Sequence, residues 1–233
     1  MPTQLRRLLD AGAPLAAFDA ILLGGAAAPD GIVAEASAAG ANVVTTYGMT
    51  ETCGGCVYDG SPLDDVRLAS GTDGLIRITG PVLFSGYRLA PELTAAAFDH
   101  GWLVTSDLGG PGRDGRLVVR GRADDVIISG GEKVTAAEVE RALRGCPAVR
   151  DAAVVGLPDP QWGELVTAVV VLADGAQPPP LAALRDLVGA SLPRYAAPQR
   201  LVVVPGIPLL ASGKPDRQSL RQLAAESAGR PGA

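Results

Sequence analysis

One strand–helix–strand pattern near the start of the chain limits the fold more than any other feature. The apolar run at residues 20–23 predicts a short strand, residues 32–39 predict a helix that ends at Gly40, and the β-branched run at 42–46 predicts a second strand. Two strands joined through a helix lie parallel in one sheet. We therefore expect an α/β fold for the first part of the chain.

After this unit the pattern changes to short strands between Gly, Pro and Asp turns. Residues 75–79 alternate apolar and polar side chains, which is typical of a strand with one buried face, and residues 117–120 predict another strand. Residues 70–74 form a Ser-Gly-Thr-Asp-Gly run directly before a strand. Because no lysine follows it, we expect a turn there and not a phosphate-binding loop.

A second module begins near residue 122. Thr135 and Glu138 are spaced as a capping box at the start of a helix that runs to about residue 143. The other expected elements are strands at 126–128, 152–157, 166–172 and 200–204, and helices at 181–188 and 213–225. We therefore expect two domains, residues 1–121 and 122–233, the second a small α+β domain.

Composition and charge exclude several classes of protein. Hydrophobic residues make up 47% of the 233, which excludes a wholly disordered chain, and a net charge of −5 argues against binding of duplex nucleic acid. His100 is the only histidine, so a site built on several histidines is excluded. We find neither a signal peptide nor an apolar run of about 18 residues, and expect a cytoplasmic protein without a membrane span.

Three cysteines do not make a disulfide framework. Cys53 and Cys56 form one Cys-x-x-Cys pair, which suits either a redox or half-zinc site or a loop with two incidental thiols. With no second pair and a distant histidine, we favour incidental thiols.

Two segments that follow strands have the chemistry of a ligand site. Gly24, Gly25 and Ala26 let a flat ligand approach bare backbone, although any tight turn looks similar. Residues 46–52 place an aromatic ring, hydroxyls and a carboxylate within one turn, where open α/β sheets bind ligands. A polar surface loop is an equally good interpretation of the second segment.

Three further segments combine charge with glycine. Asp107 follows an apolar strand, either as a turn residue or as an acceptor for a ribose diol. Residues 120–133 flank a strand with charges and glycines at the expected domain boundary, where a hinge is plausible. Lys214 is one of only two lysines and follows Gly213, so it is either an ordinary surface residue or a functional one.

In this order the five segments resemble the adenylate-forming superfamily, which includes acyl-CoA synthetases, luciferases and the adenylation domains of peptide synthetases. The resemblance covers nearly the whole chain. It implies the acyl-CoA synthetase fold: an α/β portion of the large N-terminal domain, and a small α+β C-terminal domain that moves. Matching motifs lie at 47–51 (Tyr-Gly-Met-Thr-Glu), 102–109, 122–131 and 213–214.

The resemblance implies an ATP-dependent ligase that joins a carboxylic acid to CoA through an acyl-adenylate. It implies a phosphate contact for Thr50 and a Mg²⁺ ligand in Glu51. The residues implied to bind the nucleotide are Gly24, Gly25, Ala26, Tyr47, Gly48, Thr50, Asp107 and Arg122. The residues implied to take part in catalysis are Lys214, Thr50 and Glu51.

The remaining implied roles concern domain motion and the other substrates. Asp124 matches the hinge, Lys214 would bridge the attacking carboxylate and the α-phosphate, and the Gly130-Gly131 turn would meet the pantetheine arm of CoA. The implied pocket residues for the acid are Gly48, Met49 and Cys53. Two stretches, 47–60 and 207–217, most resemble the o-succinylbenzoate–CoA ligases of menaquinone biosynthesis, so o-succinylbenzoate is the expected acid.

The chain also departs from the family's pattern. Ser106 replaces the usual glycine, and the Ser/Thr/Gly-rich loop that wraps the β- and γ-phosphates is missing. We therefore expect an N-terminally truncated chain that associates through exposed sheet edges, for instance as a homo-oligomer. The alternatives are another aryl- or acyl-CoA synthetase, or a fragment without activity of its own.

Overall fold

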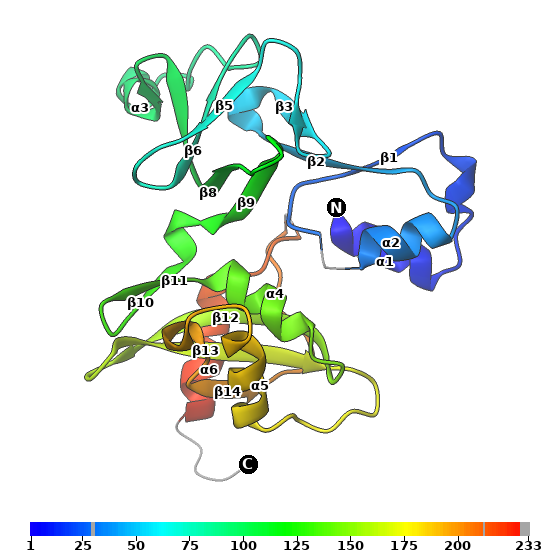
Figure 1. The fold of residues 1–233 in the computed structure, drawn as a ribbon, viewed down its shortest axis with the longest axis vertical. Coiled ribbons are helices and arrows are strands. Elements are labelled where there is room, and N and C mark those ends of the chain that lie inside the picture. The colour runs from blue at the N-terminus through cyan, green and yellow to red at the C-terminus, as the bar shows by residue number, and fades with distance from the viewer. Residues whose placement is uncertain (29–30, 212, 229–233) are drawn as a thin grey trace. The chain divides into compact units, whose positions relative to one another are not determined.

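The computed structural model describes residues 1–28, 31–211 and 213–228. The chain folds into two compact units, Met1–Arg120 and Gly121–Ala233 (Figure 1). Each unit has its own buried core, and each is described here by itself.

The strand–helix–strand pattern is present in the first unit. Strands β1 (Ile21–Leu23) and β2 (Val43–Met49) pair in parallel, joined through helix α2 (Ile32–Ala38). Gly40 lies in the left-handed region with φ of 83°, and its amide donates to the Ser37 carbonyl. This is the glycine helix end that the sequence predicts.

A small core forms where this sheet meets its helices. Helix α1 (Pro2–Asp10) and the short turn η1 (Leu15–Ala17) pack with α2 and β1. The buried residues of this core are Leu5, Leu15, Leu23, Ile32, Ala36 and Ala41.

Strand β2 continues three residues further than predicted. Residues 47–49, expected to follow the strand, belong to it and pair antiparallel with β3 (Gly54–Tyr58) after the turn η2 (Thr50–Thr52). The physical reason lies at Gly48, where a side chain would collide with the Gly54 carbonyl oxygen, so glycine lets the two strands come together.

The rest of the first unit is a second sheet. Its strands lie in the order β5-β6-β8-β7, with β9 paired to β8. The Gly71 amide donates to the Leu75 carbonyl and closes a hairpin between β5 and β6, which confirms the predicted turn at residues 70–74. The remaining elements are β4 (Ser61–Pro62), β5 (Arg67–Ser70), β6 (Leu75–Thr79), α3 (Pro91–Ala97), β7 (Phe98–Asp99), β8 (Trp102–Pro111) and β9 (Leu117–Arg122).

The second unit is built on a sheet in the order β11-β10-β13-β12, with β14 paired in parallel to β13. Helices and strands mix as expected for a small α+β domain. The elements are η3 (Ala123–Asp125), β10 (Val126–Ser129), β11 (Glu132–Thr135), α4 (Ala136–Arg144), β12 (Val149–Asp159), β13 (Gly163–Leu172), α5 (Leu181–Gly189), η4 (Arg194–Ala196), β14 (Arg200–Val203) and α6 (Arg217–Ala228).

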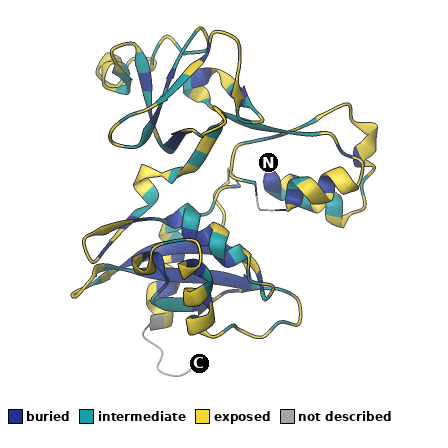
Figure 2. Cartoon of the chain, in the orientation of Figure 1, coloured by how far each residue is buried: buried dark blue, intermediate teal, exposed yellow. Residues whose placement is uncertain are grey.

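The long central strands are buried on both faces (Figure 2). In β12, Ala152 and Val154 pack with α4 and α5, whereas Ala153 and Val155 pack on the other side with Leu220 of α6. A strand buried on both faces has a continuous apolar run instead of an alternating one. This explains why its apolar segment was easy to find in the sequence.

Two local expectations for this unit are wrong. Thr135 precedes α4, but its side chain makes no capping hydrogen bond, because Thr135 is also the last residue of β11 and pairs with Val126. Helix α6 begins at Arg217 and not at Gly213, because Pro215 pairs with Leu209 in an isolated bridge. Among the described helices, none is long and apolar enough to cross a membrane.

Candidate functional site

The turn after β1 brings Gly24 against the neighbouring strand. A side chain at Gly24 would collide with the Thr46 hydroxyl, so only glycine fits between β1 and β2 at this point. Gly25 has φ of 83°, and both Gly25 and Ala26 are exposed. The turn thus presents bare backbone to solvent at the end of a parallel strand pair.

Tyr47 and Asp107 come together from different sheets. The Tyr47 hydroxyl donates a hydrogen bond of 2.8 Å to Oδ2 of Asp107, which lies in β8. Burial raises the pKa of the Tyr47 phenol well above its usual value, and the charge of Asp107 adds to this effect. Tyr47 therefore stays protonated and acts as a donor.

A buried threonine holds the Asp107 backbone. Thr105 is 5% exposed, and its hydroxyl donates to the Ile76 carbonyl at 2.9 Å while it accepts the Asp107 amide at 3.1 Å. Sequence reasoning missed this residue, although the Thr-x-Asp spacing is visible in the sequence. Ser106, between them, is exposed, so the departure from the family's glycine does not disturb the core.

Glu51 lies in the turn η2, next to the exposed Thr50. The Tyr87 hydroxyl donates to Oε1 of Glu51 at 2.8 Å, and the Phe84 amide donates to the Glu51 carbonyl at 2.9 Å. The hydrogen bond to Glu51 raises the pKa of Tyr87. One segment therefore holds Glu51 by both its side chain and its backbone.

Sequence reasoning missed Tyr87 because no periodic pattern marks the segment from 84 to 90. Its place depends on aromatic packing: the rings of Phe84 and Tyr87 meet edge to face at 4.8 Å, and Phe84 stacks on Phe98 at 5.8 Å. Such pairs hold an irregular loop that backbone hydrogen bonding alone leaves loose.

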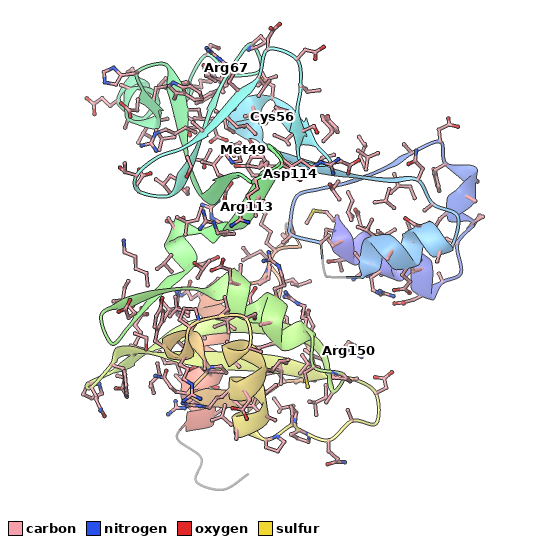
Figure 3. All side chains as sticks on the ribbon, in the orientation of Figure 1. Met49, Cys56, Arg67, Arg113, Asp114 and Arg150 are labelled. Atoms are coloured by element: carbon pink, nitrogen blue, oxygen red, sulfur yellow. The ribbon has the colours of Figure 1, made fainter. Side chains whose placement is uncertain are left out.

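The residues predicted to line the acid pocket differ in exposure. Gly48 and Cys53 are exposed, whereas Met49 is half-buried and packs against the core around Cys56 (Figure 3). Cys53 turns the chain with φ of 55°, and Thr52, 2% exposed, donates to the Gly54 carbonyl at 2.7 Å. Of the three predicted pocket residues, Met49 is the one that packs against this core.

Cys56 is a fully buried residue of β3, and burial raises the pKa of its thiol. Cys53 is exposed in the preceding turn. Within the described residues, no group of three His, Cys, Asp or Glu side chains is placed to hold a metal ion.

In the second unit, the predicted hinge segment lies in the turn η3. Nη2 of Arg122 donates to Oδ2 of Asp124 at 2.9 Å, and both side chains are exposed. An exposed pair of this kind stabilises little.

The Gly130-Gly131 turn joins β10 to β11 in a hairpin. Both glycines have positive φ, 60° and 83°, as a two-residue hairpin turn requires. The Gly130 amide donates to the Trp162 carbonyl at 2.8 Å, and a side chain at Gly130 would press on the Trp162 ring. Trp162, 42% exposed, was not predicted to belong to this surface.

Lys214 lies in a short hairpin that precedes α6. We call residues 208–216 the lysine hairpin; its residue 212 lies outside the described residues. Its amide-to-carbonyl hydrogen bonds run from Leu210 to Lys214 at 2.8 Å and from Asp216 to Pro208 at 2.9 Å. The Lys214 side chain is exposed.

The residues at Glu51 fit a metal ion that is shared with a nucleotide. Mg²⁺ usually binds one or two carboxylates together with substrate phosphates, so it needs no larger protein cluster. Glu51 has one carboxylate oxygen held by Tyr87, and its second oxygen keeps acceptor capacity.

Comparison with known proteins identifies the family of this chain. The AMP-binding enzyme C-terminal domain matches residues 138–214. Probable 2-succinylbenzoate–CoA ligase of Mycobacterium tuberculosis is 49% identical over 222 residues, which is 93% of this chain and 57% of that protein. The chain belongs to the adenylate-forming superfamily.

Other relatives agree with this family and its fold. 2-Succinylbenzoate–CoA ligase of Geobacillus kaustophilus is 37% identical, covering 88% of this chain and 46% of the relative. The structure of o-succinylbenzoate CoA synthetase from Bacillus subtilis with its acyl-adenylate superposes with a TM-score of 0.80 at 33% identity, over 94% of this chain and 49% of that one.

Amide bond synthetase McbA from Marinactinospora thermotolerans reaches a TM-score of 0.86 at 33% identity, over 95% of this chain and 50% of that one. The chain thus spans about half the length of the relatives it matches. The acyl-CoA synthetase fold predicted from the sequence is confirmed.

Proposed function

We propose that this chain serves an ATP-dependent acid–CoA ligase whose acid is 2-succinylbenzoate, in menaquinone biosynthesis. The observation that carries the proposal is the hydrogen bond between Tyr47 and Asp107. It joins two predicted nucleotide motifs 60 residues apart, one in β2 and the other in β8 of a different sheet.

The reaction has two steps. A carboxylate oxygen of the acid attacks the α-phosphorus of ATP, and the bond to pyrophosphate breaks to leave an acyl-adenylate. The thiolate sulfur of CoA then attacks the acyl carbonyl, and the bond to AMP breaks to give the thioester.

In the first unit, we assign the nucleotide to the turn after β1 and to the Tyr47–Asp107 pair. The exposed turn at Gly25 and Ala26 is the proposed contact for the flat adenine, against which the Tyr47 ring would pack. Asp107 accepts hydrogen bonds from the ribose hydroxyls, and the Tyr47 hydroxyl holds its carboxylate in place. Thr50, exposed beside Glu51, donates to the phosphate.

Glu51 is the proposed ligand of Mg²⁺, which would neutralise phosphate charge when it is bound with ATP. The chain's own contribution is to fix the Glu51 carboxylate through Tyr87.

In the second unit, we assign Lys214 to the charge that develops when the carboxylate attacks the α-phosphate. A fixed ammonium that acts mainly on this developing charge lowers the barrier. Asp124 is the proposed hinge, and the Gly130-Gly131 turn is the proposed contact for pantetheine. A cytoplasmic location and a homo-oligomer belong to the same proposal.

Support for 2-succinylbenzoate comes from the names of the relatives with 49% and 37% identity. Gly48, Met49 and Cys53 are the proposed contributions of this chain to the acid pocket. A second candidate is a long-chain acyl-CoA ligase, because a long-chain-fatty-acid–CoA ligase of M. tuberculosis is 35% identical over 227 residues.

The test uses this chain alone and a chimera. In the chimera, the chain replaces the matching segment of the mycobacterial relative. Both are incubated with ATP, Mg²⁺, CoA and either 2-succinylbenzoate, benzoate or a long-chain fatty acid, and thioester and AMP are measured.

We expect the chimera to form thioester with 2-succinylbenzoate faster than with the other acids. A chimera that folds but makes no acyl-adenylate from any acid contradicts the proposed function. Preference for the fatty acid would favour the second candidate. Thioester formed by the 233-residue chain alone would show that these residues suffice for both steps.

A further inference from the structure

We propose that Arg217 is a positioning residue that ties the base of the lysine hairpin to the hinge turn η3 and to helix α4. The inference rests on the proposed roles of Lys214 and Asp124. None of the roles implied by the family motifs falls on Arg217.

Arg217 contacts three separate segments of the second unit. Its Nη1 lies 2.5 Å from Oε1 of Glu140 in α4 and donates to the Val154 carbonyl of β12 at 3.0 Å. Its Nε lies 3.5 Å from Oδ1 of Asp125 in η3. Oε1 of Glu140 also accepts a hydrogen bond from the Val154 amide at 2.9 Å. The network is therefore bonded to strand β12 of the sheet.

The charged groups of this network are mostly buried, so each of them needs a partner. Glu140 is only 7% exposed, and the Arg217 side chain keeps 20% of its surface. Burial lowers the pKa of Arg217, but the carboxylates of Glu140 and Asp125 outweigh it and raise the pKa above its usual value. A charge held in this way is costly to leave without its partners, so the three segments stay together.

Within the described residues, the lysine hairpin is held mainly by its own backbone, through hydrogen bonds and the bridge between Leu209 and Pro215. Leu209 and Leu210 are 47% and 50% exposed, so apolar packing restrains these two residues little. The hairpin closes at its base, where the Asp216 amide meets the Pro208 carbonyl and Asp216 caps α6 by accepting from the Ser219 amide. Arg217 directly follows Asp216, so its contacts with α4, β12 and η3 restrain the base of the hairpin.

The same guanidinium contacts the residue that follows the proposed hinge. Because Asp125 is adjacent to Asp124, Arg217 connects the turn where rotation would occur to the hairpin that bears Lys214. Rotation at Asp124 would then move Lys214 together with α4 as one rigid body.

Arg144 provides a matched control. It lies at the end of the same helix, with Nη2 3.8 Å from Oε2 of Glu140, and it donates to the Ala152 carbonyl of β12 at 2.6 Å. Its side chain keeps 25% of its surface, close to the value for Arg217. Arg144 does not lie next to the lysine hairpin in the sequence, so Arg144→Met reports general destabilisation.

The first measurement is amide hydrogen exchange on the 233-residue chain. We expect Arg217→Met to speed exchange of the Leu210 and Asp216 amides by about tenfold or more, whereas Arg144→Met leaves them within about twofold of the original chain. Equal effects of the two variants would overturn the proposal.

The second measurement separates the two half-reactions in the chimera. We expect Arg217→Met to slow adenylation by about tenfold to a hundredfold while thioester formation from supplied acyl-adenylate changes little. A merely structural role slows both steps alike, as expected for Arg144→Met. Asp125→Asn and Arg217→Lys give the same comparison with less disturbance if Arg217→Met does not fold.

Lys214→Ala separates failure of this inference from failure of the proposed function. If Lys214→Ala leaves adenylation intact, the function assigned to Lys214 is wrong. If Lys214→Ala abolishes adenylation but Arg217→Met behaves like Arg144→Met, only the role of Arg217 is wrong.

Discussion

Glu51 in the first unit and Glu140 in the second are held by different kinds of donor. In the first unit, the Tyr87 hydroxyl donates to Glu51. In the second unit, Arg217 binds Glu140 and Asp125. A neutral hydroxyl orients a carboxylate without cancelling its charge, whereas a guanidinium neutralises it. The first arrangement suits a carboxylate that must bind a ligand, and the second suits one that must fix the chain.

Loss of the Lys214 ammonium should produce the largest effect on the reaction. We expect Lys214→Ala to slow adenylation by the chimera about a thousandfold, because stabilisation of the developing charge is lost. Pyrophosphate release measures this step. Thioester formation from supplied acyl-adenylate should be spared, and equal loss of both steps would contradict the assigned role. Lys133→Ala is the control, since Lys133 is the other lysine.

The carboxylate of Glu140 should dominate the stability of the second unit. We expect Glu140→Gln to lower the free energy of unfolding by about 3 kcal/mol, because Arg217 keeps its charge with its closest partner gone. Urea unfolding of the chain measures the change. Glu138→Gln on the same helix is the control. An equal loss of unfolding free energy in that variant would show that the pair of Glu140 and Arg217 has no special role in stability.

The Tyr87 hydroxyl tests the arrangement in the first unit. We expect Tyr87→Phe to raise the Mg²⁺ concentration needed for half-maximal adenylation by the chimera about fivefold, because Glu51 loses its orientation. Binding of Mn²⁺ with ATP, followed by electron paramagnetic resonance, should weaken in parallel. Tyr58→Phe, which removes a 3.4 Å hydrogen bond to the Gly55 carbonyl, is the control. If the Mg²⁺ concentration for half-maximal adenylation does not change, Tyr87 contributes packing alone and does not orient Glu51.

The smallest effect should come from the cap of α6. Hydrogen bonds from Ser219 hold the pKa of Asp216 below its usual value. The lowered folded-state pKa stabilises the chain above the ordinary value of about 4, and this contribution is lost as the pH falls through the folded pKa. The stability difference between the chain and Asp216→Asn should therefore be constant near neutral pH and shrink below about pH 4. A difference that grows on acidification would contradict this sign.

Regular elements were predictable because their patterns are local. The parallel pair β1–β2, the helix end at Gly40 and the strand β6 follow from periodicity and from one glycine. The motifs around Tyr47, Asp107 and Lys214 were also visible as recognisable runs of residue types, although Tyr47 and Asp107 lie inside β2 and β8 and do not follow them.

The sequence by itself determined the superfamily, and it predicted a two-part organisation and the residue types that we propose for a nucleotide. Only the tertiary structure decided the partners: Tyr87 for Glu51, Thr105 for Asp107, and Glu140 and Asp125 for Arg217. It also turned Thr135 from a helix cap into a strand residue. The physical reason is that these contacts join segments separated along the chain, and their energy depends on burial that no local pattern records.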